Sequence, residues 1–399
     1  MLERLFAQRV GSVPRSFIRE ILKVTSQPNV ISFAGGLPNP ELFPVEEFRE
    51  SANRILSNHG QAALQYTTTE GYPPLRRFIA ERYREKKGLI VRPEDILITT
   101  GSQEGLDLAG KVFLDREDVV LLERPSYLGA IQAFSAYQPS FAAVELDEDG
   151  INISALEREL DSRPTKLFYT VPNFQNPSGI TYSREKRESF ARVMSSRNTA
   201  VIEDDPYGEL RFLGSDLPNL KNLLPESCIL LGSFSKIVSP GIRIGWMVAP
   251  ESAMRALVTF KQGTDLHTGN LDQRILFDYL SHTDLDAHID KIRAAYRIQR
   301  DAMVTLLEAH CPEGVTFTRP EGGMFVWVTL PENASAMELF ERAIKEQVAF
   351  VPGDAFHIGG SGKNSLRLNF SSTSPDRIET GLVKLTRVMK DYLAEIGKP

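Results

Sequence analysis

The chain has 399 residues, of which 42% are hydrophobic and 25% are charged, and its formal net charge is -6. The length suggests two or three domains, each able to bury a core. An acidic balance without a Lys/Arg run argues against nucleic acid as the main partner.

Cysteine usage and the N-terminus indicate the compartment. The two cysteines, Cys228 and Cys311, form neither a metal-ligand spacing nor a disulfide framework, which favours a reducing environment. The opening "MLERLFAQRV" lacks the apolar core of a signal peptide, and no apolar stretch approaches membrane-spanning length. We therefore expect a cytoplasmic protein without a membrane segment.

The first two thirds of the chain predict an α/β domain. Residues 1–45 end in an irregular, turn-rich connection, and helical periodicity covers residues 46–58 and 73–87. Short apolar runs then alternate with helical stretches as far as residue 275. Continuous apolar strands between helices are typical of a largely parallel sheet that is covered on both faces. We place this large domain at residues 46–275.

The pattern changes after residue 275. A long helical segment, "DLDAHIDKIRAAYRIQRDAMVTLLEAH", is followed by separated strands such as "GGMFVWVTL" and "SLRLNFS". This pattern predicts a smaller α+β domain at residues 276–399. We expect the N-terminal segment, residues 1–45, to join it and to cover the active site.

Polar residues follow several of the predicted strands. In "ILITTGSQEGLDLAG", Ser102 and Gln103 open a helix after Gly101, where free N–H groups suit a phosphate, although serine at such a position is more often only a helix cap. In "YTVPNFQNPSG", Asn176 lies in a stiff turn, where its amide either binds a ligand oxygen or serves the turn alone.

A third strand ends in "EDDPYGEL", with Asp204 and, three residues later, Tyr207. A carboxylate at this position is a metal ligand, a loop cap or the partner of a cationic ring nitrogen. No His/Asp/Glu cluster elsewhere completes a metal site, so we expect no metal.

Lys236, in "GSFSKIVSPGIRIGW", lies between two apolar strands, with Arg243 seven residues later. A desolvated lysine near other cations has a lowered pKa and forms covalent bonds with aldehydes. A lysine in a loop is usually only solvated. Together, however, the four motifs suit one ligand with a phosphate, a ring nitrogen, a ring oxygen and an aldehyde, namely pyridoxal phosphate.

These motifs resemble those of the fold-type I pyridoxal-phosphate aminotransferases of class I/II. Within that class the chain is most similar to the kynurenine/2-aminoadipate aminotransferases, including bacterial enzymes of lysine biosynthesis. The resemblance covers nearly the whole chain and includes "SFAGGLPNPELFP", "LQYTTTEGYPPLR", "PSYLGAIQAF" and "RPEGGMFVW". It implies a large domain with a mostly parallel seven-stranded sheet and a small α+β domain.

The resemblance also implies roles for residues around the cofactor. Lys236 would hold the cofactor covalently and later move the substrate proton, while Asp204 would pair with the ring nitrogen. Asn176 and Tyr207 would bind the ring oxygen. The remaining expected cofactor contacts are Tyr127 on the ring, then Ser102, Gln103, Ser233, Ser235 and Arg243 at the phosphate, and Tyr66 at the phosphate of the neighbouring subunit of a homodimer.

On the substrate side, the resemblance implies that Arg367, in "LRLNFS", binds the α-carboxylate together with Asn176. Without it, Arg367 would be read as a surface arginine of a strand. Arg19 matches a helix position that faces a distal carboxylate, as in 2-aminoadipate or glutamate, and is otherwise a surface charge. Gly36 leaves room beside it for long or aromatic side chains, as in leucine or the aromatic amino acids.

We therefore expect a transaminase that moves an amino group from an L-amino acid to a 2-oxo acid such as 2-oxoglutarate by a ping-pong mechanism. Two alternatives stay open from the residues alone. One is another fold-type I enzyme, such as a lyase, a racemase or a decarboxylase. The other is a non-enzymatic sensor that binds the same cofactor.

Overall fold

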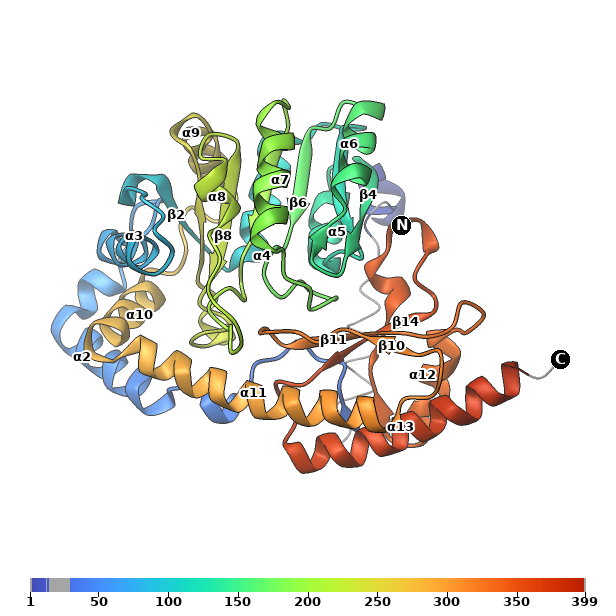
Figure 1. Ribbon diagram of the computed structural model, residues 1–399. Coiled ribbons are helices and arrows are strands. Elements are labelled where there is room, and N and C mark those ends of the chain that lie inside the picture. Colours follow the sequence, from blue (N-terminus) through green and yellow to red (C-terminus); the bar gives the residue numbers. More distant parts are fainter. Residues whose placement is uncertain (1, 12, 14–28, 398–399) are drawn as a thin grey trace.

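The computed structural model describes residues 2–11, 13 and 29–397. Its centre is an eight-stranded sheet with the order β2-β9-β8-β7-β6-β3-β4-β5 (Figure 1). All neighbouring strands pair in parallel, except that β9 is antiparallel to both its neighbours and β5 is antiparallel to β4. The strands are β2 (Ile96–Thr99), β3 (Val119–Arg124), β4 (Ser140–Asp147), β5 (Gly150–Ile151), β6 (Leu167–Thr170), β7 (Ala200–Asp204), β8 (Cys228–Ser233) and β9 (Gly245–Val248).

The large sheet has one strand more than the seven that we expected. The additional strand is β5, which covers only two residues and pairs back onto the end of β4. Gly150, the first residue of this strand, has a φ of 130°, a conformation that favours glycine. A two-residue strand is too short to produce a recognisable pattern of side chains, so the sequence did not reveal it.

Helices cover both faces of this sheet, as the continuous apolar strands predicted. One face carries α4 (Ser102–Phe113), α5 (Leu128–Ser135) and α9 (Glu251–Gln262), and the other carries α6 (Ile153–Ser162), α7 (Arg184–Ser195) and α8 (Leu220–Leu223). Side-chain caps begin two of these helices, because Asn152 accepts from the N–H of Ala155 and Ser183 from that of Lys186. Every residue of β6 and of β8 is buried.

Three further helices pack beside the edge strand β2. They are α2 (Val45–Ala63), α3 (Pro73–Lys87) and α10 (Asn270–His282), with α2 lying against α10 (Figure 1). The first two confirm the helices expected over residues 46–58 and 73–87. Helix α3 ends at Gly88, whose φ of 59° stops the helix in the left-handed region.

The last third of the chain builds a second, antiparallel sheet with the order β10-β11-β14-β13. Two long helices, α11 and α13, run alongside each other beneath it, and the shorter helix α12 packs on α13 (Figure 1). These elements are β10 (Thr316–Phe317), β11 (Phe325–Thr329), β13 (Val351–Pro352), β14 (Ser365–Asn369), α11 (Leu285–His310), α12 (Ala336–Lys345) and α13 (Pro375–Ile396).

The segment before α2 pairs with this smaller part. Strand β1 (Ile31–Ser32) lies parallel to β12 (Val348–Ala349), and Phe33 exchanges backbone hydrogen bonds with Ala349 and Asn369. On this basis we propose the division into an N-terminal segment at 1–45, a large domain at 46–275 and a small domain at 276–399.

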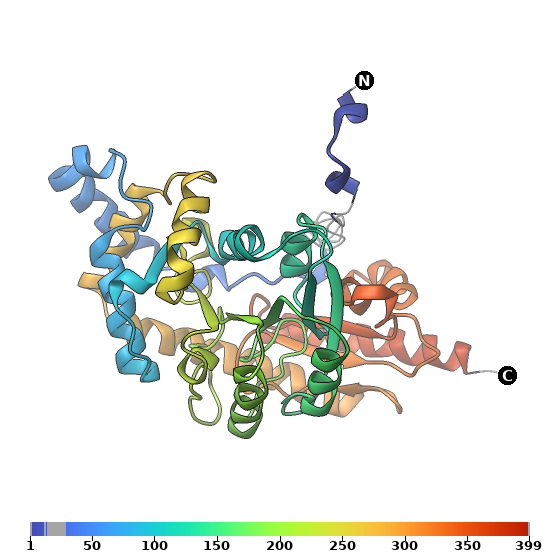
Figure 2. The same cartoon turned by 90° about the horizontal axis from the view of Figure 1, so that it is seen from above.

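Short 3-10 helices complete the described part of the chain. The first two project away from the rest of the molecule (Figure 2). No helix within residues 2–11, 13 and 29–397 is long and apolar enough to cross a membrane. The 3-10 helices are η1 (Leu2–Leu5), η2 (Gln8–Gly11), η3 (Pro40–Leu42), η4 (Pro93–Asp95), η5 (Pro240–Ile242), η6 (Gly353–Phe356) and η7 (Ile358–Gly360).

Candidate active site

One cavity of about 490 Å³ lies where the carboxyl ends of the large-sheet strands face the small sheet. Ligands of open α/β sheets collect at this edge. The predicted residues that line the cavity are Gly36, Ser102, Gln103, Tyr127, Asn176, Asp204, Tyr207, Ser233, Ser235, Lys236, Arg243 and Arg367. The structure thus brings together side chains from motifs that are far apart in the sequence.

Two predicted residues are not among those that line the cavity. Tyr66 lies on the surface with 76% of its area exposed, and its ring meets that of His267 edge-on at 5.7 Å. Arg19 lies outside the residues that the structure describes.

Lys236 lies in the connection between β8 and β9. Its Nζ donates a 3.0 Å hydrogen bond to the carbonyl oxygen of Gly36. Burial, together with the positive charges of Arg367 and Arg243, lowers the pKa of Lys236 to about 8. Near neutral pH, a much larger fraction of this amine is therefore unprotonated and able to attack an aldehyde than in an ordinary lysine.

Asp204 is the last residue of β7 and is 3% exposed. Its Oδ2 accepts a 2.8 Å hydrogen bond from the hydroxyl of Tyr169, while its buried Oδ1 has no partner among the described residues. Burial raises the pKa of Asp204 to about 7, and the charges of Asp205 and Glu123 add to this effect. A buried oxygen without a donor suits a protonated ring nitrogen.

Arg367 is a buried cation in the middle of β14. Its Nη1 donates to Asn176 Oδ1 at 2.8 Å, and its Nη2 donates to the carbonyl of Ala34 at 2.7 Å. The rings of Phe325 and Phe356 lie 4.4 Å and 5.0 Å from the guanidinium carbon. Burial lowers its pKa to about 10, so the group remains charged at neutral pH. Two rings and two acceptors hold it in one orientation, ready for a carboxylate.

Tyr207 and Tyr127 bring two further buried hydroxyl groups to the cavity. Burial raises the pKa of both, and the charge of Asp204 contributes to the shift in each case. The ring of Tyr207 packs edge-on against Phe325 at 5.9 Å. Both phenols are therefore neutral near pH 7 and can donate a hydrogen bond to a ligand.

The far end of the cavity is built for an anion. The N-terminus of α4 opens into it, with Ser102 and Gln103 in the first turn. Arg243 has only the backbone carbonyls of Pro240 and Thr100 as hydrogen-bond acceptors in the described chain. Gly101 has a φ of 78°, and a Cβ there would lie 2.2 Å from Arg243 Nη2. Glycine at position 101 thus allows Arg243 to approach the N-terminus of α4. Together, the arginine and the helix N-terminus favour the binding of a phosphate.

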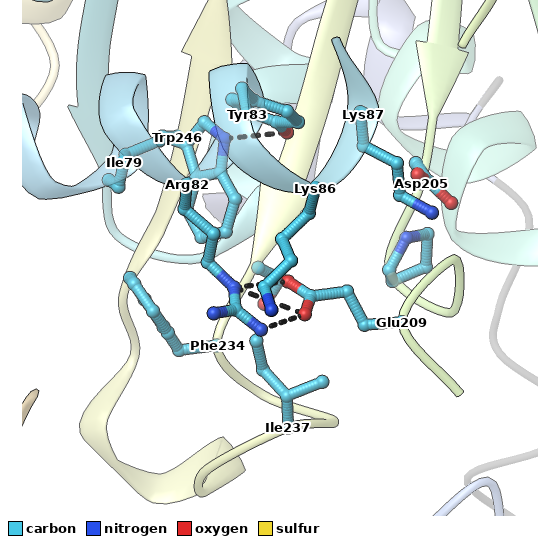
Figure 3. A pocket seen from close by; sticks show the side chains of 12 residues that line it. Ile79, Arg82, Tyr83, Lys86, Lys87, Asp205, Glu209, Phe234, Ile237 and Trp246 are labelled. Carbon is cyan, nitrogen blue, oxygen red and sulfur yellow. Dashed lines mark hydrogen bonds and ion pairs between the residues drawn. The ribbon is translucent and has the colours of Figure 1, made fainter. Parts of the chain in front are cut away.

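A smaller pocket lies behind the lysine-bearing connection (Figure 3). Phe234 and Ile237 line this pocket, whereas Lys236, between them, lines the main cavity. Its charged groups already have partners, because Arg82 Nε donates to Glu209 Oε1 at 2.9 Å, and Lys86 and Lys87 pair with carboxylates outside the pocket. We regard this pocket as part of the packing that supports the connection from behind.

The described residues contain no group of three or more His, Cys, Asp or Glu side chains placed to hold a metal ion. The donors and acceptors of the main cavity instead fit an organic cofactor. A reactive amine, an unpaired buried carboxylate oxygen and an anion-binding helix end match the aldehyde, ring nitrogen and phosphate of pyridoxal phosphate.

Fold and site together define a pyridoxal-phosphate enzyme of fold type I. The chain belongs to the aminotransferase class I and II family, which it matches over residues 28–385. It is 46% identical to a 2-aminoadipate transaminase of Thermus thermophilus over 98% of this chain and 97% of that protein. It is 42% identical to aromatic-amino-acid aminotransferase 1 of Thermococcus litoralis over 98% and 95%.

A solved structure gives the same result. The fold superposes with a TM-score of 0.93 on an α-aminoadipate aminotransferase of Thermus thermophilus, in complex with N-(5'-phosphopyridoxyl)-L-leucine. The two chains are 44% identical, and the match covers 99% of this chain and 100% of the other. The expected fold, cofactor and transaminase activity are therefore confirmed, and neither the other fold-type I enzymes nor the sensor is favoured.

Proposed function

We propose that this aminotransferase takes its amino group from L-2-aminoadipate or glutamate, and also from leucine or aromatic amino acids, and passes it to 2-oxoglutarate. The observation that carries the proposal is Arg367, a desolvated cation held toward the cavity that contains Lys236. Relatives that act on 2-aminoadipate and on aromatic amino acids support a broad donor range.

The residues of the cavity suggest a division of labour. Bound pyridoxal phosphate supplies an aldehyde that accepts the amino group and a ring that withdraws electrons. Lys236 would hold the aldehyde carbon and, once released, would take the proton from the substrate Cα as a general base. Asp204 would keep the ring nitrogen protonated. Arg367 would fix the α-carboxylate so that the Cα–H bond faces the amine.

The other contacts would hold the cofactor in place. Asn176 and Tyr207 would bind the ring oxygen, and Tyr127 would pack on the ring. At the phosphate we assign the side chains grouped around the start of α4 and the end of β8, namely Ser102, Gln103, Ser233, Ser235 and Arg243.

We further propose a cytoplasmic homodimer in which Tyr66 serves the neighbouring site. Leu64, Tyr66 and Leu266 are exposed on one surface. The two segments are tied there by side chains, because the Thr67 N–H donates to His267 Nε2 and Asn270 Nδ2 donates to the carbonyl of Gln65. Exposed apolar groups that gather in this way favour association. The absence of a disulfide between Cys228 and Cys311 agrees with a reducing compartment.

The first experiment records the absorbance spectrum of the cofactor-loaded protein before and after L-2-aminoadipate is added, without any oxo acid. We expect the band of the lysine-bound cofactor to disappear and the band of its amine form to grow. An unchanged spectrum with 2-aminoadipate, but a change with leucine, phenylalanine or kynurenine, would contradict a dicarboxylic donor.

We propose Arg19 as the reader of the distal carboxylate, and Gly36 as the residue that leaves room for long or aromatic side chains. The variant Arg19→Ala should therefore lose activity on 2-aminoadipate and keep activity on leucine. An equal loss on both substrates would remove Arg19 from this role.

A further inference from the structure

Tyr169 was not among the expected site residues, yet it lies in the main cavity and contacts Asp204. Tyr169 pairs with Ile202 of the neighbouring strand β7, so its side chain is on the same sheet face as Asp204, two residues further on. A long aromatic side chain spans this diagonal separation. The 2.8 Å hydrogen bond between the two side chains thus follows from the strand register.

The surroundings leave the tyrosine little freedom. Its side chain is fully buried, and its ring meets Phe134 of α5 edge-on at 6.0 Å. Among the described residues, the hydroxyl of Tyr169 has Asp204 as its hydrogen-bond partner. The hydroxyl is therefore held against one carboxylate oxygen.

This contact decides which oxygen of Asp204 is available. Oδ2 accepts from Tyr169, and Oδ1 remains unpaired at the cavity wall. A buried carboxylate without the hydroxyl would be free to turn and would lose a stabilising donor. The hydrogen bond from Tyr169 lowers the pKa of Asp204, against burial and the charges of Asp205 and Glu123 that raise it.

We propose that Tyr169 is a positioning residue, which holds the Asp204 carboxylate with its free oxygen directed at the ring nitrogen of the cofactor. The inference rests on the proposed role of Asp204 and extends it to the residue behind it. Tyr169 then determines how strongly the protein binds the ring nitrogen of the cofactor, and it does not affect the contacts that other residues make with the cofactor.

The test compares two ligands that differ at that atom. Protein freed of cofactor is titrated with pyridoxal phosphate and with its 1-deaza analogue, in which a C–H group replaces the ring nitrogen. Dissociation constants are measured by fluorescence quenching for the wild-type protein and for Tyr169→Phe. The matched control is Tyr182→Phe, which also removes the hydroxyl of a fully buried tyrosine that donates to a buried carboxylate, here Glu123.

We expect Tyr169→Phe to weaken binding of pyridoxal phosphate by about tenfold or more, because it removes a hydrogen bond to a charged group, and to leave binding of the analogue nearly unchanged. Tyr182→Phe should keep the wild-type ratio of the two constants. Equal losses for both ligands in Tyr169→Phe, or no loss at all, would show a merely structural tyrosine and overturn the inference.

The wild-type protein separates this inference from the proposed role of Asp204. If it binds both ligands equally well, Asp204 does not pair with the ring nitrogen, and the basis of the inference fails with it.

If Tyr169→Phe does not fold, 3,5-difluorotyrosine at position 169 keeps the ring and changes the strength of the hydroxyl as a hydrogen-bond donor. We then expect the ratio of the two constants to change by about twofold or more, and an unchanged ratio overturns the inference.

Discussion

Arg367 of the small sheet donates a 2.8 Å hydrogen bond to Asn176, which follows strand β6 of the large sheet. The contact joins residues that are 191 positions apart. The residue expected to bind the substrate carboxylate, Arg367, is therefore hydrogen-bonded to a residue expected to bind the cofactor ring, Asn176. Both side chains are buried, at 3% and 5% exposure, so the contact is shielded from water.

The geometry of Arg367 predicts the effect of a conservative change. In Arg367→Lys the charge remains, but the flat group between Phe325 and Phe356 and the two-pronged carboxylate contact are lost. We expect KM for the amino acid to rise roughly tenfold to a hundredfold while the cofactor stays bound. Steady-state kinetics with Arg377→Lys, an exposed arginine of α13, provide the control. Unchanged KM in Arg367→Lys would exclude the carboxylate contact.

Lys236 is expected to be the group that moves the proton. Lys236→Ala should fold and bind pyridoxal phosphate without a covalent bond, and lose turnover by about two to four orders of magnitude. Turnover assays and the spectrum of the bound cofactor measure both properties, with exposed Lys86→Ala as the control. Near-normal turnover in Lys236→Ala would contradict the assignment.

The lowered pKa of Lys236 predicts how cofactor capture depends on pH. Only the unprotonated amine attacks the aldehyde, so the capture rate should rise with pH and level off above about 8, not near 10.5 as for an ordinary lysine. Arg367→Leu removes a positive charge that disfavours the protonated form of Lys236. The pKa of Lys236 should therefore rise, and the midpoint of the rate-against-pH curve should move to higher pH. Stopped-flow mixing with cofactor measures the midpoint. A wild-type midpoint at 10 or above would refute the prediction.

Subunit mixing tests where Tyr66 acts. Lys236→Ala and Tyr66→Ala proteins are each prepared, then mixed under conditions that exchange subunits. If Tyr66 serves the partner's site, the mixed dimer contains one intact site, and about a quarter of wild-type activity should return. If Tyr66 serves its own subunit, every site keeps one defect and mixing restores nothing. Reassociated single variants provide the baseline.

The sequence predicted those site residues that end a strand or lie in the polar turn after it. Asp204, Asn176 and Lys236 all have this form, and the structure places them in one cavity. The parallel sheet explains this success, since the carboxyl ends of its strands meet at one edge. The mutual arrangement of the side chains, such as the pairing of Arg367 with Asn176, depends on packing between the two sheets and had no local signal.

Tyr169 shows why other site residues were missed. It lies inside the apolar strand "LFYT", where a tyrosine is read as a core residue. Its role depends on the register between β6 and β7, which the pattern of one strand does not determine. The contacts of Lys236 and Arg367 with backbone carbonyls escaped notice for a simpler reason, because every residue carries a carbonyl.

These carbonyl contacts tie the N-terminal segment to the chemistry of the site. Gly36 accepts from Lys236, and Ala34 accepts from Arg367. The amine of Lys236 has fewer N–H groups once it has bonded to carbon. The guanidinium of Arg367 has fewer N–H groups left for backbone carbonyls once it donates to a carboxylate. The N-terminal segment thus supplies a backbone acceptor to each of these two cations, and the contact with Lys236 changes once its amine bonds to carbon. Amide exchange at residues 34–37 would then report the loading of the site from the backbone side.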